Sequence, residues 1–201
     1  MTTLHWGILG AAHIAETRMI PAMKEAKSST LTAIGSRDIT RARALAALGD
    51  GAKAYDSYEA VLADEDVNAV YIPLPNGLHA EWAIKAAEAG KHVLVEKTFA
   101  ANADEAERVV EACAKKGVTL SEAFMYRFHP LTRRVLDISR SGLLGKVRSI
   151  NTTFAFTLDD DNDIWKNLAL AGGALFDLGT YCVHLARAIA GDEPIEVMAR
   201  R

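Results

Sequence analysis

The sequence predicts an α/β protein that begins with a doubly wound parallel sheet. Two observations support this prediction: short strands alternate with helices through the first 120 residues, and most of these strands are apolar on both faces. Strands of that kind belong to parallel sheets that helices cover on both sides. The pattern changes after about residue 123, which indicates a second structural unit in the rest of the chain.

The elements of the first unit follow in order along the chain. Short apolar runs predict six strands, at 4–9, 31–35, 53–55, 69–72, 92–95 and 118–120. Helical spacing predicts the helices between them, at 13–26, 39–48, 57–63, 79–89 and 102–116. Gly90 and Gly117 follow the last two helices, where glycine commonly ends a helix. Six strands in this rhythm match the doubly wound nucleotide-binding architecture.

The remaining residues follow a different pattern. A helix is expected over 129–141, ending at Gly142. Residues 146–157 are β-branched and partly alternating, which predicts a strand in a sheet with one covered face. A polar, acidic loop follows, then a helix over 173–190, and residues 195–199 begin a further predicted strand.

Composition narrows the class of protein. Half of the 201 residues are hydrophobic, enough for one well-buried core and part of a second. The net charge of −3 and the lack of a long basic run argue against a nucleic-acid partner. We find neither a signal peptide nor an uninterrupted apolar stretch of about 20 residues, so we expect a cytoplasmic protein without membrane contact.

No metal site is expected from the spacing of potential ligands. Cys113 and Cys182 lie in separate, alanine-rich helical segments and are interpreted as small core residues. The acidic run Asp159-Asp160-Asp161, followed by Asn162-Asp163, could hold a cation, but such a run is more often a solvated loop.

The turn after the first strand is the candidate phosphate loop. Gly10, Ala11, Ala12, His13 and Ile14 link the strand directly to the first helix. A dinucleotide loop turns at its first glycine, approaches the pyrophosphate at its second, and binds through backbone N–H groups at the helix end. Ala12 replaces the second glycine, so the prediction depends on the loop's place in the alternating pattern.

The end of the second strand is expected to select the dinucleotide. Ser36 and Arg37 suit the 2′-phosphate of NADP, and Arg37 could also stack on adenine. Asp38 keeps NAD possible, because a carboxylate there accepts bonds from the ribose hydroxyls. The alternative is that Ser36 or Asp38 caps the next helix while Arg37 is solvated, and the two roles are compatible.

Two further loops should border the nicotinamide, because ligands bind at the carboxyl ends of the strands. The first contains the candidate cofactor contacts Pro73, Leu74, Asn76 and His79, and the second begins with Glu96 and Lys97. The Lys97 ammonium could stabilise a developing alkoxide, or a neutral Lys97 amine could take a proton. The alternative for Glu96 and Lys97 is a solvated strand end. The alternative for His79 is a histidine that only takes part in the cap at the start of the helix.

The segment 172–184 contains a third candidate group. On a helix, Asp177 and Tyr181 are four residues apart and share a face, so they could bind a polyol and relay a proton. An aspartate among apolar neighbours needs polar partners. For His184 we favour a buried, singly hydrogen-bonded role.

Six segments together resemble the glucose–fructose oxidoreductase / inositol dehydrogenase / MocA-like family, in the branch with D-xylose dehydrogenase and dihydrodiol dehydrogenase. They are the GILGAAHIA start, Ser36-Arg37, PLPNGLH, GKHVLVEKTFA, EAFMYRFHP and GGALFDLGTYCVHLAR, which span essentially the whole chain. The resemblance implies a Rossmann domain at 1–123. It also implies part of a substrate and oligomerisation domain at 124–201, with an open, mainly antiparallel sheet.

The resemblance also implies an activity. We expect reversible hydride transfer between NADP(H), or NAD(H), and a CH–OH group of an aldose, polyol or cyclic diol. In the roles that the resemblance implies, Lys97 is catalytic and Tyr181 is the acid/base. By the same resemblance, Asp177 belongs to the site and is expected to orient the substrate, and Arg127 and His129 lie near nicotinamide and substrate. A homo-oligomer is also implied.

Two features depart from the family pattern. Thr98 replaces the expected proline after Lys97, which removes a rigid φ angle from that turn. Family members are also longer than 201 residues, so the chain is expected to be a fragment or a natural truncation. The alternatives to an active enzyme are a dinucleotide-binding sensor and an inactive fragment.

Overall fold

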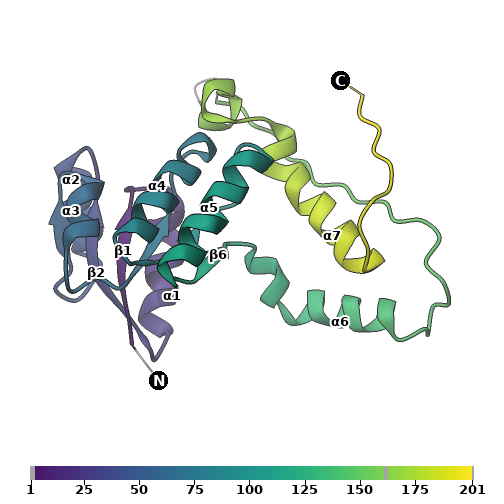
Figure 1. The fold of residues 1–201 in the computed structure, drawn as a ribbon, viewed down its shortest axis with the longest axis horizontal. Helices are drawn as coiled ribbons and strands as arrows, with labels where there is room; N and C mark the ends of the chain where they lie inside the picture. Colours follow the sequence, from purple (N-terminus) through teal and green to yellow (C-terminus); the bar gives the residue numbers. More distant parts are fainter. Residues whose placement is uncertain (1–2, 161–162, 201) are drawn as a thin grey trace.

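The computed structural model describes residues 3–160 and 163–200. Its centre is a six-stranded sheet with the order β3-β2-β1-β4-β5-β6 (Figure 1). Every pair of neighbouring strands is parallel. The strands are β1 Leu4–Leu9, β2 Ser29–Gly35, β3 Lys53–Tyr55, β4 Ala69–Ile72, β5 His92–Val95 and β6 Leu120–Glu122. The strand order reverses at β1, so the loops after β1 and β4 diverge there and leave a crevice.

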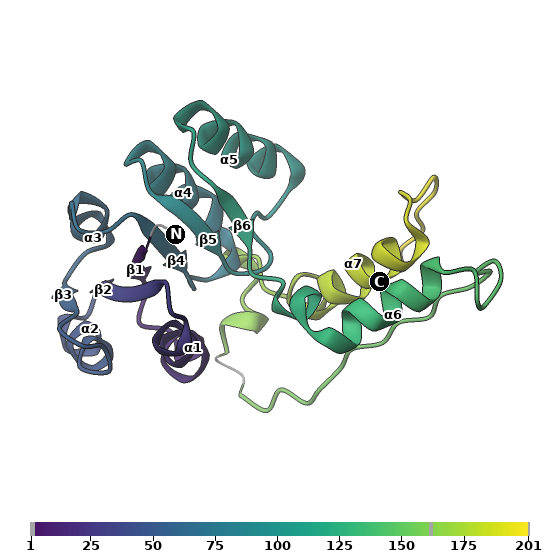
Figure 2. The ribbon, with the colours of Figure 1, turned by 90° about the horizontal axis from the view of Figure 1, so that it is seen from below.

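Helices cover both faces of this sheet, as Figure 2 shows. One face carries α1 and α2, and the other carries α3, α4 and α5. The bounds are η1 Ala15–Met19 (a π-helical turn), α1 Ile20–Glu25, α2 Ile39–Ala46, α3 Tyr58–Ala63, α4 Asn76–Glu88 and α5 Ala103–Lys116. The predicted doubly wound parallel sheet is therefore confirmed.

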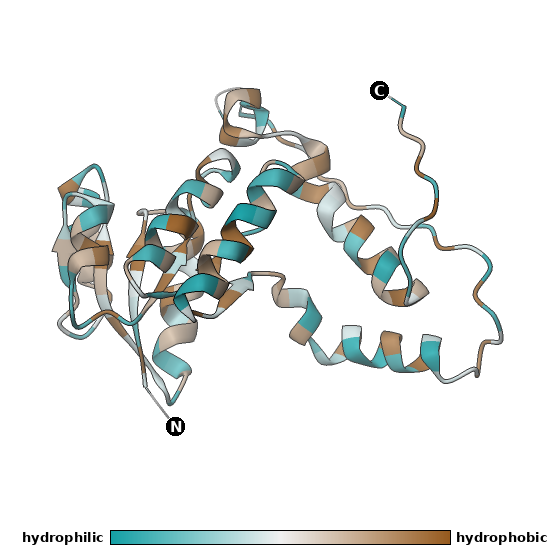
Figure 3. Cartoon of the chain, in the orientation of Figure 1, coloured by the Kyte–Doolittle hydropathy of each residue, from teal (hydrophilic) through white to brown (hydrophobic). Residues whose placement is uncertain are grey.

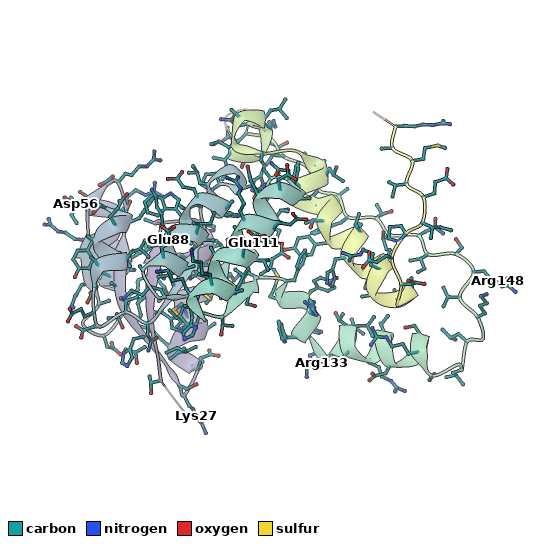
Figure 4. All side chains as sticks on the ribbon, viewed as in Figure 1. Lys27, Asp56, Glu88, Glu111, Arg133 and Arg148 are labelled. Carbon is teal, nitrogen blue, oxygen red and sulfur yellow. The ribbon has the colours of Figure 1, made fainter. Side chains whose placement is uncertain are left out.

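Two apolar cores, one on each face, hold these layers together. Alternating strand residues divide between them: Val70 and Ile72 pack towards α3–α5, whereas Tyr71 packs towards α1 and α2. Trp82 and Val109 fill the first core, and Ile20 lies in the second. Charged residues lie outside both cores. Figure 4 labels six that are exposed: Lys27, Asp56, Glu88, Glu111, Arg133 and Arg148.

The predicted element bounds needed small corrections. Helix α4 begins at Asn76, three residues before the predicted start, because Pro75 precedes it as the N-cap. The strand predicted at 118–120 lies instead at Leu120–Glu122, because the Val118 amide is used to close the turn after α5. The first helix begins with the π-helical turn η1.

The C-terminal segment, residues 124–200, is helical where it is regular. Its elements are η2 Met125–Phe128, α6 Pro130–Arg140, η3 Ile164–Lys166, η4 Leu168–Leu170, η5 Leu175–Gly179 and α7 Thr180–Ala190. The helices predicted at 129–141 and 173–190 are confirmed, although the second opens with the π-helical turn η5. Together α6 and α7 extend away from the sheet (Figure 1).

The strands predicted at 146–157 and 195–199 were wrong for this structure. Both segments are extended but irregular. A strand needs backbone partners, and the described residues pair neither segment with another strand. Apolar side chains in these segments, such as Phe154, Phe156 and Ile195, are exposed. Figure 3 shows further apolar residues on α6 and α7.

One stretch of the described chain has the length and composition of a membrane-crossing helix. It is Leu168–Ala190, with a mean hydropathy of 1.3 and 11% of its scored window buried. The stretch contains Asp177 and Arg187, and core helices of water-soluble proteins pass the same test. The expectation of no membrane contact therefore stays a prediction.

A buried carboxylate ties β3 to the loop before β4. The Lys53 ammonium lies 3.0 Å from Asp64 Oδ1, and the Tyr55 hydroxyl donates to Asp64 Oδ2 at 3.0 Å. The Asp66 amide also donates to Asp64. Burial raises the pKa of Asp64, but these hydrogen bonds lower it by more, so its pKa lies below the usual value.

Replacing Asp64 by Asn should therefore destabilise the fold at pH 7 by about 1–3 kcal/mol, because the donors from Lys53, Tyr55 and Asp66 lose a buried, charged acceptor. The lowered pKa makes this stability fully present above the unfolded-state pKa and lost as the pH falls through the folded-state value. Urea unfolding at pH 7 and at pH 2–3 measures both effects, and the two proteins should converge at low pH. The exposed Asp66→Asn variant is the control. A loss of stability that is equal at both pH values would contradict the assignment.

Candidate active site

A cleft of about 560 Å³ lies at the carboxyl edge of the sheet, where the loops after β1, β4 and β5 meet. Each of these loops follows a parallel strand, so the topology alone brings them together. The C-terminal segment closes the other side. The lining residues are Ala12, His13, Ile14, Thr17, Arg18, Pro73, Leu74, Pro75, Asn76, Glu96, Lys97, Asp163, Ile164, Trp165, Leu170 and Gly172.

The phosphate loop has the backbone that the sequence predicts. Gly10 has φ +120°, and a Cβ there would lie 2.9 Å from Leu74 Cδ2, so only glycine fits. Its amide donates to the Gly35 carbonyl at 2.9 Å, which ties the loop to β2. Ala12, His13 and Ile14 line the cleft, whereas Ala11 is buried behind them.

The residues after β2 form a helix cap and a basic group. Asp38 is the N-cap of α2 and accepts from the Thr40 amide at 2.8 Å, so the predicted capping alternative holds for this residue. The Ser36 hydroxyl accepts from the Asp38 amide at 3.2 Å, and Arg37 is exposed. Arg41 of α2 donates to the Ala11 carbonyl of the phosphate loop at 2.5 Å.

Arg41 was missed in the sequence analysis. Its signal is its place in the first turn of the helix that follows Ser36-Arg37-Asp38, where a long cation can reach back to the end of β2. The structure therefore brings a second guanidinium to this side of the phosphate loop.

Lys97 lies at the junction of the two parts of the chain. Its side chain is 13% exposed and lines the cleft. The Nζ atom donates to the Asp177 carbonyl at 3.1 Å and lies 3.9 Å from the Asp177 carboxylate. It also lies 5.7 Å from the ring centroids of Trp165 and Tyr181, within cation–π range.

Thr98 holds the turn beside Lys97 in a way that proline could not. Its hydroxyl donates to the Phe176 carbonyl at 2.9 Å, across the boundary between the sheet and the C-terminal segment. The hydrogen bond compensates in part for the rigid φ angle that the threonine lacks.

Asp177 is close to Lys97, but its carboxylate does not reach the cleft. The side chain is 4% exposed, and it does not line the cleft. One carboxylate oxygen accepts from Asn76 Nδ2 at 3.1 Å, and the other accepts from the Gly173 amide at 3.0 Å. The expectation that Asp177 orients the substrate is therefore corrected, because both oxygens already have protein partners. Asp177 instead positions Asn76 and Lys97.

Tyr181 does not line the cleft, but it lies in an aromatic cluster beside Lys97, and its hydroxyl lies 3.8 Å from Met125 Sδ. Its ring contacts Phe124, Tyr126 and Phe154, with centroid separations of 5.4 to 5.7 Å. Burial, together with the carboxylates of Glu96 and Glu122, raises the pKa of Tyr181 to about 12. Tyr181 is therefore protonated at neutral pH.

Glu96 is a partly buried carboxyl at the end of β5. The Tyr71 hydroxyl donates to its Oε1 at 2.7 Å. Burial raises the pKa of Glu96, although Tyr71 and Lys97 oppose the rise. Glu96 lines both the cleft and a second, apolar cavity of about 590 Å³ next to η1 and α1.

His79 does not line the cleft. Its side chain is 0% exposed, and both ring nitrogens face backbone carbonyls within the protein. The prediction that His79 contacts the cofactor is therefore corrected. The ring lies behind the two loops that form the cleft wall.

Two residues of the EAFMYRFHP segment also lie elsewhere. Arg127 lines a separate cavity between α6 and α7, and His129 caps α6 by accepting from the Leu131 amide at 3.1 Å. The structure does not bring either one to the cleft, because η2 turns their side chains towards α6. His184 is hydrogen-bonded to Tyr126, as predicted, and stacks on Phe124, but it is only partly buried rather than buried.

The loop before η5 supplies a wall that the sequence analysis missed. Trp165, Leu170 and Gly172 line the cleft, and a Cβ on Gly77 would lie 3.2 Å from the Leu170 backbone. The acidic run preceding Trp165 was interpreted as solvated. Asp161 and Asn162 lie outside the described residues, and the described residues contain no group of three or more potential metal ligands.

The parallel sheet and the loop at Gly10 have the architecture of a dinucleotide-binding Rossmann fold. Residues 4–124 match the family described as "Oxidoreductase family, NAD-binding Rossmann fold", and residues 132–201 match "GFO/IDH/MocA C-terminal domain". The chain belongs to the GFO/IDH/MocA oxidoreductase family, as the resemblance implied.

Its relatives include enzymes that act on sugars. D-xylose 1-dehydrogenase (NADP(+)) 2 from Haloferax volcanii is 50% identical over 187 residues, which are 92% of this chain and 57% of that protein. A 3-ketoreductase from Actinomadura kijaniata, solved with NADP and TDP-benzene, is 37% identical with a TM-score of 0.88, over 94% of this chain and 57% of that one. Aldose–aldose oxidoreductase from Caulobacter crescentus, solved with glycerol, is 33% identical with a TM-score of 0.89, over 96% and 59%. The chain thus spans less than two thirds of each relative's length.

Replacing Asn76 by Ala should loosen the C-terminal segment from the sheet. Asn76 Nδ2 bridges the Asp177 carboxylate and the Ala171 carbonyl, so the variant leaves both buried acceptors unpaired. Hydrogen exchange should accelerate across residues 168–180 by roughly tenfold while the exchange of the β1 and β4 amides stays unchanged. The exposed Asn151→Ala variant is the control, and equal protection of residues 168–180 in both variants would contradict this role.

Proposed function

We propose that this protein transfers a hydride between NADP(H) and a CH–OH or carbonyl carbon of an aldose, polyol or related sugar. The observation that carries the proposal is the position of Lys97, which lines one cleft together with the phosphate loop residues Ala12 to Ile14. A dinucleotide bound along that loop would place its nicotinamide end near the Lys97 amine. NADP-dependent action of relatives on xylose supports the substrate class.

The basic group after β2 favours NADP over NAD. Ser36, Arg37 and Arg41 bring a hydroxyl and two guanidinium groups to this end of β2, beside the single carboxylate of Asp38, which also caps α2. Such cations match a 2′-phosphate, whereas a carboxylate matches the ribose hydroxyls of NAD. NAD remains the second, weaker cofactor in this proposal.

Proton transfer is assigned to Tyr181, next to Lys97. With its pKa raised to about 12, Tyr181 is a phenol at neutral pH, the form that can donate a proton to a carbonyl oxygen. The Lys97 ammonium stabilises negative charge on the substrate oxygen, and Asp177 holds the Lys97 amine in place.

The proposal also covers the domain boundaries, the oligomeric state and the cellular location of the protein. We place the Rossmann domain at 1–123 and the partial substrate and oligomerisation domain at 124–201. A homo-oligomer in the cytoplasm, without nucleic acid or membrane partners, completes the proposal. The antiparallel sheet of the second domain belongs to the same proposal, although the described residues do not pair its predicted strands.

Titration with NADPH and NADH, followed by energy transfer from tryptophan, tests the cofactor. NADPH should bind more tightly, and Arg41→Ala should weaken NADPH binding by about tenfold while changing NADH binding little, because a charged hydrogen bond is lost. Arg43→Ala, on the exposed side of the same helix, is the control. Tighter NADH binding would reassign Asp38 as the ribose ligand, and no binding of either would sink the enzyme proposal.

Replacing Lys97 by Ala tests the catalytic assignment. Turnover with aldoses and NADP should fall by about a hundredfold or more, since an electrostatic contact to the reacting oxygen is lost. The Kd for NADPH should change little. Lys146→Ala, far from the cleft, is the control. Near-normal turnover of the Lys97 variant would contradict the role, and NADPH binding without turnover in the parent protein would favour a sensor.

A further inference from the structure

The buried histidine behind the cleft has a geometry that the proposed reaction does not use. His79 Nδ1 lies 2.7 Å from the Thr98 carbonyl oxygen, and Nε2 lies 2.6 Å from the Leu74 carbonyl oxygen. The first carbonyl belongs to the loop after β5 and the second to the loop after β4. One side chain thus spans the two loops whose front surfaces form the cleft wall.

Each of the two loops that His79 joins also contacts another part of the site. The Leu74 carbonyl belongs to the turn Pro73–Pro75, which lines the cleft ahead of α4. The Thr98 carbonyl directly follows Lys97, and the Thr98 hydroxyl reaches the C-terminal segment at Phe176. His79 itself is fixed by α4, whose first turn also provides Asn76.

The chemistry of the ring makes these contacts specific. Both partners are carbonyl oxygens, which accept hydrogen bonds and cannot donate them. Two donated bonds would require a proton on each nitrogen. Burial and the nearby Lys97 ammonium lower the pKa of His79, although the two carbonyls oppose that decrease, so at pH 7 the neutral ring donates to one carbonyl while its other nitrogen packs against the second. An apolar residue of the same size would leave both carbonyls without this donor.

We propose that His79 is a positioning residue that clamps the Leu74 and Thr98 carbonyls together and thereby fixes Lys97 against the cleft. The proposal deepens the proposed function, because it rests on Lys97 as the catalytic lysine. His79 touches neither cofactor nor substrate, since its side chain has no exposed surface. Its effect reaches the cleft through the Thr98 carbonyl, which directly follows Lys97, and through the Leu74 carbonyl of the neighbouring loop.

The test measures Lys97 itself, so that it does not depend on turnover. The Lys97 side chain is 13% exposed, and its amine donates to the Asp177 carbonyl. Acetylation of the folded chain with acetic anhydride, followed by peptide mass spectrometry, gives the labelling rate of this one lysine. Losing one or two net hydrogen bonds from the clamp should raise the Lys97 rate in His79→Leu by roughly two- to tenfold.

Two matched controls separate the clamp from general loss of stability. His92→Leu makes the same substitution at the start of β5, the strand that ends before Glu96. Val109→Ala opens the same apolar core from α5 without touching either loop. Neither control should change Lys97 labelling by as much as twofold. Val109→Ala and His79→Leu are compared at equal melting temperatures. An equal rise of the Lys97 labelling rate in both variants would overturn the proposal.

His79→Gln is the conservative variant and covers the case in which His79→Leu does not fold. Its side-chain amide can donate to one carbonyl, as the neutral ring does, but it lacks the rigid ring that spans both, so its labelling rate should lie between those of the parent protein and His79→Leu. If His79→Leu fails to fold, a Lys97 rate in His79→Gln equal to that of the parent protein overturns the proposal. So does parent-like labelling in a folded His79→Leu.

NADPH binding by the same variants separates the proposed function from the proposed role of His79. Because His79 also holds the Leu74 turn, which lines the cleft, His79→Leu should bind NADPH more weakly than the parent protein by roughly two- to tenfold. Should the parent protein bind no NADPH, the proposed function fails, while the labelling rates still decide whether His79 positions Lys97. Where turnover is measurable, kcat should fall more than KM rises, because the amine is displaced rather than the substrate pocket lost.

Discussion

The contact between the first turn of α4 and the π-helical turn η5 determines how the C-terminal segment meets the sheet. Asp177 enters this contact with 4% of its side chain exposed, and a carboxylate so buried needs polar partners on every side. Asn76 supplies one and the Gly173 amide another, while the Asp177 carbonyl accepts from Lys97. The bonds from Asn76 and Lys97 join residues 101 and 80 positions apart, so the cleft exists only when both parts of the chain are folded.

The packing around Lys97 also brings several titratable side chains close together. Glu96 and Glu122 have raised pKa values because they are partly buried, and their charges add to burial in raising the pKa of Tyr181. Lys97 is the cation at the centre of this group. A site of this kind keeps a phenolic proton available at neutral pH, which suits the delivery of a proton to a carbonyl oxygen that is accepting a hydride.

Different parts of the site were predictable to different degrees. Lys97 could be placed from the sequence because the end of a parallel strand always faces the ligand edge. Arg41 and Trp165 could not, since a helix surface and an irregular loop give no periodic signal for what they face. His79, Asp177 and His129 were assigned contacts with ligands, but their side chains have partners inside the protein, and Arg127 lines a different cavity.

The sequence by itself determined the alternation of strands and helices, the order of the parallel sheet elements and the phosphate loop after β1, because these features depend on local periodicity and on glycine at a backbone position with φ +120°. Only the tertiary structure decided which polar side chains reach the cleft. Strand formation at 146–157 was also decided at that level, because a strand depends on partners elsewhere in the protein. Local pattern specifies a residue's element, whereas burial and hydrogen-bond partners, which come from distant residues, specify its role.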